Sequence, residues 1–188
     1  MMRRGMAPVI RIFALVILAL LLGGCVTYSG VDSSVNDVRQ ALRRSVADGR
    51  MPVAVIGNPF AGASAKLEGL AAAALERHMD WLKAEFYIAA AGAPGDKILF
   101  VIDPVRVRHT RDICADPPSV PFERLGAIMR IGAVYCADRV ISEVWASLDR
   151  PASADDAVLA EVIDGLAWRV IPWVTKDQEE KRRTEVDS

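Results

Sequence analysis

Two patterns of hydrophobic and polar residues divide this chain into elements, one with a helical repeat and one with the alternation of strands. The helical repeat predicts three helices, at 34–48, at 64–79 and in the region that begins at Pro151. Continuous or alternating apolar runs predict five strands, at 52–57, 85–90, 97–102, 127–136 and 140–148. Because most strands are grouped together, the order predicts an α+β two-layer domain, with a mixed sheet of about five strands and two to three helices mainly on one face.

Polar and turn-forming residues mark where several of these elements begin and end. Ser34 is a good N-cap for the first helix and Gly49 a natural stop, while Ser153 is expected to cap the last helix. The loop 58–62, between a strand and a helix, is a place where phosphate sites also occur. It lacks the motifs of a P-loop or a dinucleotide site, so a tight turn with Phe60 packed beneath it is the favoured interpretation.

A different pattern occupies the amino terminus. Arg3 and Arg4 precede an uncharged apolar run at 12–22, and the run ends in Leu22-Gly23-Gly24-Cys25. A basic start followed by an apolar core of about 7–15 residues is typical of a secretory signal, whereas a spanning helix needs about 20. With a leucine and two small residues before the cysteine, the segment resembles a bacterial lipoprotein signal peptide and its lipobox.

This resemblance implies that the signal is removed and that Cys25 is acylated to become the first residue. The alternatives are an uncleaved amino-terminal anchor helix and an ordinary cleaved signal with an incidental cysteine. In lipoproteins of enteric bacteria an Asp after the cysteine retains the protein at the inner membrane, so Val26 resembles the outer-membrane default, and the expected location is the outer membrane, facing the periplasm. The expected organisation is a signal peptide at 1–24, a tether at 25–33, a single periplasmic domain at 34–174 and a disordered charged tail at 175–188.

The chain contains three cysteines. If lipid occupies Cys25, then Cys114 and Cys136 remain as a pair in an oxidising compartment, and we predict a disulfide between them. A redox pair would usually show Cys-x-x-Cys spacing, and a metal site would need neighbouring histidines or carboxylates. Free thiols are the remaining alternative. The sequence therefore predicts neither a metal nor a cofactor.

Charge removes one class of partner. The whole chain has 23 basic and 24 acidic residues, and loss of the three arginines in the signal leaves 20 basic and 24 acidic residues, a net charge of −4. This balance argues against a nucleic-acid partner. Arg39, Arg43 and Arg44 lie off the apolar stripe of the first helix, where a solvated face is favoured over contact with anionic lipid.

Chemically active side chains cluster in one segment, at 109–121, which is expected to be an irregular surface loop held by the disulfide. His109 and Asp112 could serve a nucleophile there, but no nucleophile motif is present. His78 lies beside an apolar stripe, where a partly buried, hydrogen-bonded histidine is favoured over a ligand or base. No catalytic residue is predicted.

Three functional hypotheses follow. The leading one is a lipid-anchored envelope protein that acts as a binding, structural or accessory module with an unidentified envelope partner. The second is an envelope-acting hydrolase that uses His109 with Asp112 or Glu123. The third is a carrier or transport accessory for an apolar ligand, with a cavity lined by Phe100, Met129 and Trp145. At fold level only, the domain resembles small α+β domains of transport-auxiliary lipoproteins and of the curli secretion lipoprotein.

Overall fold

The computed structural model describes residues 26–30, 35–60, 62–105, 110–123 and 126–171. The strands within these residues are β1 (Thr27–Gly30), β2 (Arg50–Ile56), β3 (Glu85–Ile88), β4 (Lys97–Ile102), β5 (Ile128–Cys136) and β6 (Val140–Asp149). The helices are α2 (Val35–Ser45), α3 (Ser64–His78), α4 (Thr110–Ala115) and α5 (Ala157–Val170), with short 3₁₀ turns η1 (Asp80–Leu82) and η2 (Pro117–Ser119). The predicted signal peptide, Cys25 and the tail at 175–188 lie outside the described residues.

All six of these strands form one mixed sheet in the order β1-β6-β5-β4-β2-β3. β2 runs parallel to both of its neighbours, β3 and β4, while the remaining pairs are antiparallel. The α+β class is therefore confirmed. The sheet has one strand more than expected, because the sequence pattern did not show β1.

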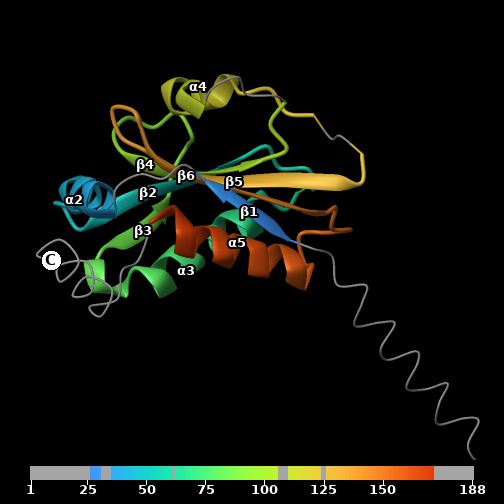
Figure 1. The fold of residues 1–188 in the computed structure, drawn as a ribbon, viewed down its shortest axis with the longest axis horizontal. Helices are drawn as coiled ribbons and strands as arrows, with labels where there is room; N and C mark the ends of the chain where they lie inside the picture. The colour runs from blue at the N-terminus through green and yellow to red at the C-terminus, as the bar shows by residue number, and fades with distance from the viewer. Residues whose placement is uncertain (1–25, 31–34, 61, 106–109, 124–125, 172–188) are drawn as a thin grey trace, which may run out of the picture.

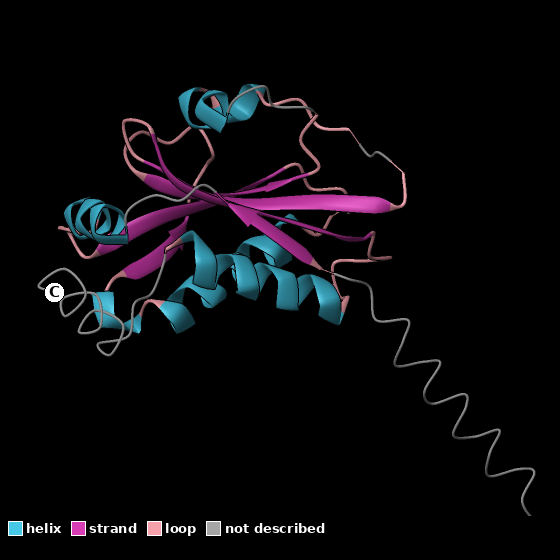
Figure 2. Ribbon diagram, viewed as in Figure 1, coloured by secondary structure: helices cyan, strands magenta, loops and turns pink. Residues whose placement is uncertain are grey.

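Helices cover both faces of the sheet, unequally (Figures 1 and 2). α3 and α5 lie on one face and pack against each other over the larger core, to which α2 also contributes Val38 and Leu42. α4 lies on the other face, over a smaller core that includes Leu99, Val134 and Ile113. The expectation of helices mainly on one face holds for α2, α3 and α5 but not for α4, so the domain is not purely two-layered.

β4 shows why a continuous apolar run marks the centre of this sheet. Every residue of β4 is buried. Side chains alternate along a strand, so Ile98 and Phe100 enter the larger core, whereas Leu99 and Val101 enter the smaller core on the opposite face. A strand covered on both faces has no position left for a polar alternation.

Residues 27–30 correct the predicted tether. They form β1, which pairs antiparallel with β6 at the edge of the sheet, with Thr27 opposite Ser147 and Gly30 opposite Val144. Thr27 and Tyr28 favour a strand, but the segment is too short for an alternating pattern to show it, and pairing with a long neighbouring strand sets its conformation. The interval between Cys25 and the folded domain is therefore much shorter than expected.

Two further expectations are wrong. The predicted irregular loop at 109–121 contains α4 and the 3₁₀ turn η2 within its described part. The last helix is capped by Asp156 rather than Ser153, because the Asp156 side chain accepts a hydrogen bond from the backbone N–H of Val158 at 3.0 Å. Ser153 instead accepts from the N–H of Asp155, one turn earlier in the chain.

The predicted disulfide between Cys114 and Cys136 is present, with 5.5 Å between the two Cα atoms. It joins α4 to the end of β5 and closes a loop with a sequence separation of 22. Cys136 is buried in the smaller core, so the bond fixes α4 over that face of the sheet.

Candidate functional site

A cleft opens between α2 and the turn that joins β5 to β6. It consists of two adjoining pockets of about 400 Å³ each. Both pockets are lined by Ala41, Arg44, Arg139 and Ile141, one of them also by Asp37, Gln40 and Val140, and the other by Ala137, Asp138 and Asp96. Sites for small ligands usually have volumes of about 300–1,000 Å³, so each pocket is large enough for a small molecule or for a side chain of a partner.

The cleft carries charges of both signs that are not paired with each other. Arg44 and Arg139 are exposed, and neither guanidinium forms an ion pair or a hydrogen bond with any residue that the structure describes. The aspartates of the lining lie beside them without making an ion pair there. Guanidinium groups present several N–H donors in a fixed plane, which suits a carboxylate or phosphate. The cleft therefore offers two unused binding groups for an anion.

One wall of the cleft is held by a chain of hydroxyl groups. The Ser45 Oγ lies 2.6 Å from the Tyr135 hydroxyl and is also hydrogen-bonded to the carboxylate of Asp96. Ser45 is the last residue of α2, Asp96 precedes β4, and Tyr135 belongs to β5. The contact thus ties the end of the helix to two strands of the sheet.

The protonation state of Tyr135 determines which group donates and which accepts in these hydrogen bonds. Tyr135 is fully buried, and burial raises the pKa of its phenol to about 12, although the hydrogen bond with Ser45 lowers it in part. The phenol therefore keeps its proton at neutral pH. Since Asp96 can only accept, the consistent arrangement has Tyr135 donating to Ser45 and Ser45 donating to Asp96.

This arrangement does not make Ser45 a nucleophile. A serine nucleophile needs a base that takes its proton, usually a histidine. The chain has two histidines, of which His78 is bound to Asp164 and His109 lies outside the described residues. The Ser45 proton already points to a carboxylate that also lines the cleft. The three groups are therefore best understood as the support of the cleft wall.

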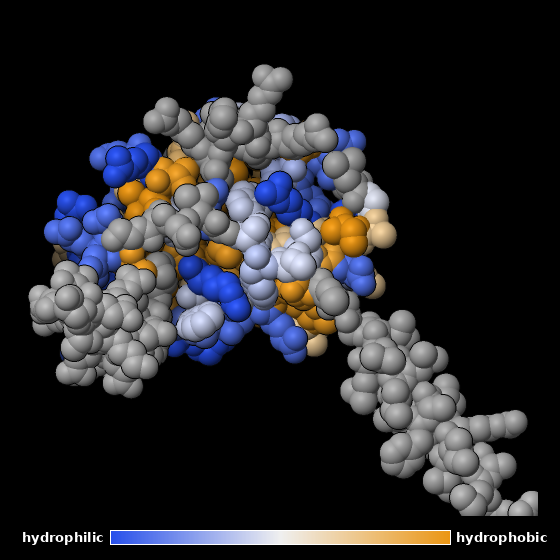
Figure 3. Space-filling model, in the orientation of Figure 1, coloured by the Kyte–Doolittle hydropathy of each residue, from blue (hydrophilic) through white to orange (hydrophobic). Residues whose placement is uncertain are grey.

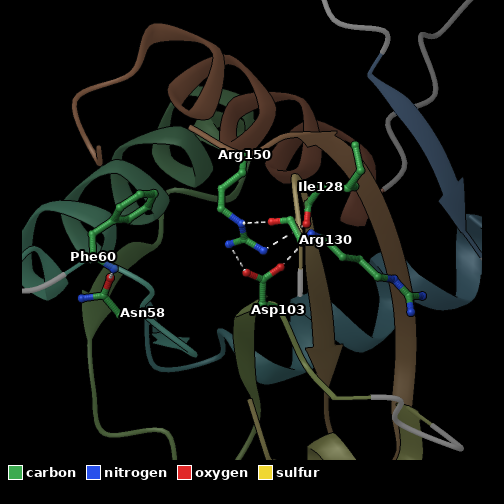
Figure 4. A network of polar contacts seen from close by, with 7 residues as sticks. Asn58, Phe60, Asp103, Ile128, Arg130 and Arg150 are labelled. Atoms are coloured by element: carbon green, nitrogen blue, oxygen red, sulfur yellow. Dashed lines mark hydrogen bonds and ion pairs between the residues drawn. The ribbon is translucent and has the colours of Figure 1, made fainter. Parts of the chain in front are cut away.

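A second polar network lies at the opposite end of the strands, where β4 ends (Figure 4). The Arg150 Nη1 donates to Oδ2 of Asp103 at 2.5 Å, and the side chains are only 7% and 8% exposed. Oδ1 of Asp103 accepts from the backbone N–H of Arg130 at 3.0 Å. Arg150 also donates to the carbonyl oxygens of Gly126 and Ile128, each at 3.0 Å. This network joins the end of β4 to the start of β5 and the end of β6.

The backbone around this network is tightly constrained. Asp103 has a φ of 49°, in the left-handed region that few non-glycine residues adopt. Gly57, which follows β2, has a φ of 81°, and a Cβ there would lie 2.1 Å from the Ile102 carbonyl oxygen. The carboxyl ends of parallel strands are a common place for ligands. Here the charges of Asp103 and Arg150 pair with each other, so we interpret the network as a structural link that holds the ends of the strands together.

The loop after β2 makes the tight turn that the sequence predicts. The Asn58 side chain accepts from the backbone N–H of Phe60 at 2.9 Å and donates to the Ser64 hydroxyl at 3.0 Å. Phe60 is partly buried against the larger core, as expected. The polar groups of Asn58 and Ser64 are thus used within the turn, which gives no support to a phosphate site.

His78 is partly buried and hydrogen-bonded, as predicted. Its Nε2 lies 3.0 Å from Oδ2 of Asp164, whose other oxygen accepts from Arg77 at 2.6 Å. Burial alone would raise the pKa of Asp164, but the hydrogen bonds from Arg77 and His78 outweigh it and hold that pKa below its usual value. The cluster joins α3 to α5 and has no cleft beside it among the pockets described above.

The residues of the hydrolase hypothesis are only partly described. His109 lies outside the described residues, and for Asp112 the structure describes a position in α4 without the side chain. Glu123 is exposed, and its backbone N–H donates to the Asp103 carbonyl oxygen at 3.2 Å. No convergence of the three groups is therefore established.

The carrier hypothesis named three residues that do not share a cavity. Phe100 and Met129 are buried in the larger core, with exposures of 1% and 0%. Trp145 belongs to the smaller core on the opposite face of the sheet. The backbone of the sheet separates the two groups, so they cannot line one cavity between sheet and helices.

Arginine side chains stack on aromatic rings at several places on the surface. On α2, the Arg39 and Arg43 guanidinium carbons lie 4.9 and 6.0 Å from the centroid of the Trp81 ring. Two of the three arginines that were expected on a solvated helix face therefore pack on Trp81. Only Arg44 turns to the cleft, a distinction that helical spacing does not reveal.

Comparison with known proteins gives a coarse resemblance. No family model matches the chain, and no curated protein does. Two solved structures of the PelC dodecamer from Paraburkholderia phytofirmans, one of them a single-substitution variant, match with TM-scores of 0.41 and 0.40 at 13% identity. The matches cover 78% and 77% of this chain and 95% and 96% of those chains. A likeness of this size carries no functional argument.

Two further features of the described residues bear on function. None of the described helices has both the length and the apolar character needed to cross a membrane. Within the same residues, no three histidine, cysteine or acidic side chains lie close enough together to hold a metal ion.

Proposed function

We propose that this protein is a lipid-anchored lipoprotein of the bacterial cell envelope, held at the outer membrane and facing the periplasm. Its role is that of a binding or accessory module, and the cleft between α2 and the β5–β6 turn is where it binds. The anchor is the acylated Cys25. A partner that presents charged groups to the cleft, with an anionic group at Arg44 and Arg139 and a cationic group at the neighbouring aspartates, fits its lining better than an uncharged one.

The disulfide supports the compartment. Disulfides persist in oxidising compartments such as the periplasm and are rare in the cytosol. The bond between Cys114 and Cys136 joins two elements that are otherwise held by few contacts, α4 and the sheet. A structural bond of this kind agrees with the secretory signal pattern at the amino terminus.

The observation that carries the binding role is the pair of unused guanidinium groups in the cleft. Elsewhere in the described chain, Arg50, Arg77 and Arg150 each pair with a carboxylate. Arg44 and Arg139 are held at the two sides of a cleft without such a partner. A charged group in an incoming partner would find two donors already in place and little backbone rearrangement to make.

Lipidation is tested by expressing the full-length chain in a Gram-negative host with an alkyne analogue of palmitate. The expected result is label on the wild-type chain and none on Cys25→Ser, with the labelled protein in the outer-membrane fraction. Label on neither chain, or equal label on both, contradicts the anchor. Non-reducing mass spectrometry of the same samples checks that the Cys114–Cys136 bond is intact in both.

The cleft is tested with a photo-crosslinking amino acid at Gln40, which is exposed and lines it. A discrete crosslinked adduct is expected in intact cells, and it should be lost in the double variant Arg44→Gln/Arg139→Gln. The control Arg43→Gln/Lys83→Gln makes the same charge change outside the cleft and should keep the adduct. An adduct of unchanged intensity in the cleft variant rules out the proposed binding site.

A further inference from the structure

The short distance between Cys25 and β1 fixes which surface of the domain must lie near the membrane. β1 begins at Thr27, only two residues after Cys25. An extended chain spans at most about 3.6 Å per residue, so Cys25 lies within about 7 Å of the Thr27 Cα. If lipid holds Cys25 at the bilayer, the β1 edge of the sheet must lie close to the membrane surface.

An aromatic surface lies next to that point. Tyr28, in β1, is 36% exposed, and Trp168, near the end of α5, is 46% exposed. The guanidinium carbon of Arg169 lies 4.1 Å from the Tyr28 ring centroid and 4.9 Å from that of Trp168. We call Tyr28, Trp168 and Arg169 the β1–α5 surface. β1 and α5 lie next to each other in the view of Figure 1.

Local packing holds the three side chains together. The position of Gly165 on α5 allows the close approach, because a Cβ there would lie 2.4 Å from the Tyr28 hydroxyl oxygen. Arg169 Nη1 donates to the Gly165 carbonyl oxygen at 2.9 Å. Arg169 forms no ion pair with a carboxylate in the described part of the chain. Its guanidinium is therefore available to an anion outside the molecule.

We infer that the β1–α5 surface rests in the headgroup layer of the membrane, with Arg169 against lipid phosphate. Trp and Tyr rings concentrate at the membrane–water interface, because they combine an apolar body with a polar end. Arginine at that depth keeps its charge in the headgroup region while its stem packs on apolar groups. Figure 3 shows apolar and hydrophilic residues intermixed over β1 and α5, which suits contact with the interface rather than insertion into the hydrocarbon.

A lipid surface fits these residues better than a protein partner for a geometric reason. Isolated exposed aromatic residues are ordinary on any protein and need no partner. What distinguishes this surface is its distance from the anchor, since Tyr28 is three residues from Cys25. The inference rests on the anchor part of the proposed function and does not depend on the cleft.

The experiment supplies the anchor chemically. The chain from Cys25 to Ser188, with its disulfide intact, has Cys25 as its free thiol and is coupled to maleimide lipid in phosphatidylcholine vesicles. Some vesicles carry a spin label near the headgroup, which quenches tryptophan at that depth. The emission of Trp168 is obtained as the difference between the wild-type chain and Trp168→Phe.

Trp81 provides the matched control. It also stacks with arginines, but it lies in η1, which leads into β3 at the opposite edge of the sheet from β1. At least twofold quenching of Trp168 with little quenching of Trp81, read from Trp81→Phe, is the expected result. No quenching of Trp168, or equal quenching of both, overturns the inference. Because coupling does not require enzymatic lipidation, this result is independent of the palmitate experiment.

Discussion

The Arg150 guanidinium donates to the carboxylate of Asp103 at 2.5 Å, and both side chains are more than nine-tenths buried. The two residues are 47 positions apart in the chain. Each also bonds to the backbone of β5 or of the residues before it, so the pair fastens three strands at one end of the sheet. Removing two charges from water is costly, and the cost is offset here by the number of hydrogen bonds that each group makes.

Replacing Asp103 by Asn should lower the free energy of unfolding by about 3–5 kcal/mol, because it leaves the Arg150 charge buried without a counter-charge. Asn tolerates the left-handed backbone of this position, so the substitution tests the charge rather than the conformation. Denaturant unfolding measures the change. Glu85→Gln is the control, because it breaks the exposed Arg50–Glu85 pair and should cost less than about 1 kcal/mol. Equal losses of unfolding free energy in the two variants would contradict a structural role of the buried Asp103–Arg150 pair.

The disulfide should contribute about 3 kcal/mol to stability in the chain-entropy model, given the sequence separation of 22 between its cysteines. The double variant Cys114→Ala/Cys136→Ala should lose this amount and should expose α4 to proteolysis first, because few other contacts join α4 to the sheet. Both chains are compared with Cys25→Ser in the background, so that no free thiol complicates the result. A variant as stable and as resistant as its parent would show that packing alone holds α4.

Elements with strong periodicity were predictable from the sequence. β4 was predicted with its observed bounds, and α3, β5 and β6 within one or two residues, because each buries a regular set of side chains. The Cys114–Cys136 pairing was also predictable, by counting cysteines in an expected compartment. These features depend on local pattern or on simple arithmetic.

Features that depend on tertiary contacts were not predictable. β1 is four residues long and becomes a strand through its pairing with β6. α4 precedes Pro117 and Pro118, so its segment had the composition of a loop, although the disulfide holds it as a short helix. Nothing in the sequence pattern joins Asp103 to Arg150, which are 47 positions apart.

The cleft illustrates the same limit for the candidate site. Its two sides are α2 and the β5–β6 turn. More than ninety residues of sequence separate Arg44 on one side from Arg139 on the other. The helical pattern showed that Arg44 lies off the apolar stripe, but not that it faces a second arginine across a cleft. Helical spacing identifies the exposed side of a helix, while the neighbour on that side is set by the fold.

Gly132 should not tolerate a side chain. It pairs with Trp145 across β5 and β6, and a Cβ at Gly132 would lie 2.4 Å from the Trp145 ring. Gly132→Ala must therefore displace the indole, and we expect a loss of about 1–3 kcal/mol from overpacking. Gly69→Ala is the control, because Gly69 lies within α3 with open space around it and alanine there should stabilise the helix by up to about 1 kcal/mol. A neutral Gly132→Ala would mean that the Trp145 ring moves freely.

Tyr135 should make the protein sensitive to alkaline pH. Burial raises the pKa of its phenol from 10.0 to about 12 in the folded state, so the unfolded chain loses this proton first as pH rises. The stabilisation is fully present below about pH 10 and is lost as pH rises through about 12, a change of roughly 3 kcal/mol at 1.36 kcal/mol per pH unit. Tyr135→Phe lacks this titration, so its free energy of unfolding should fall less steeply than that of the wild-type chain between pH 10 and 12.

Near pH 12 the wild-type chain should be less stable than Tyr135→Phe, whereas at neutral pH it should be the more stable of the two. Tyr135→Phe then loses the hydrogen bond to Ser45, which should cost about 1 kcal/mol. Ser45→Ala removes the same bond but keeps the buried phenol, so it should share the neutral-pH loss and retain the steep alkaline decline. Urea unfolding of the three chains at several values between pH 7 and pH 12 distinguishes the two effects. Parallel curves for the wild type and Tyr135→Phe would show that the phenol is not desolvated as its burial implies.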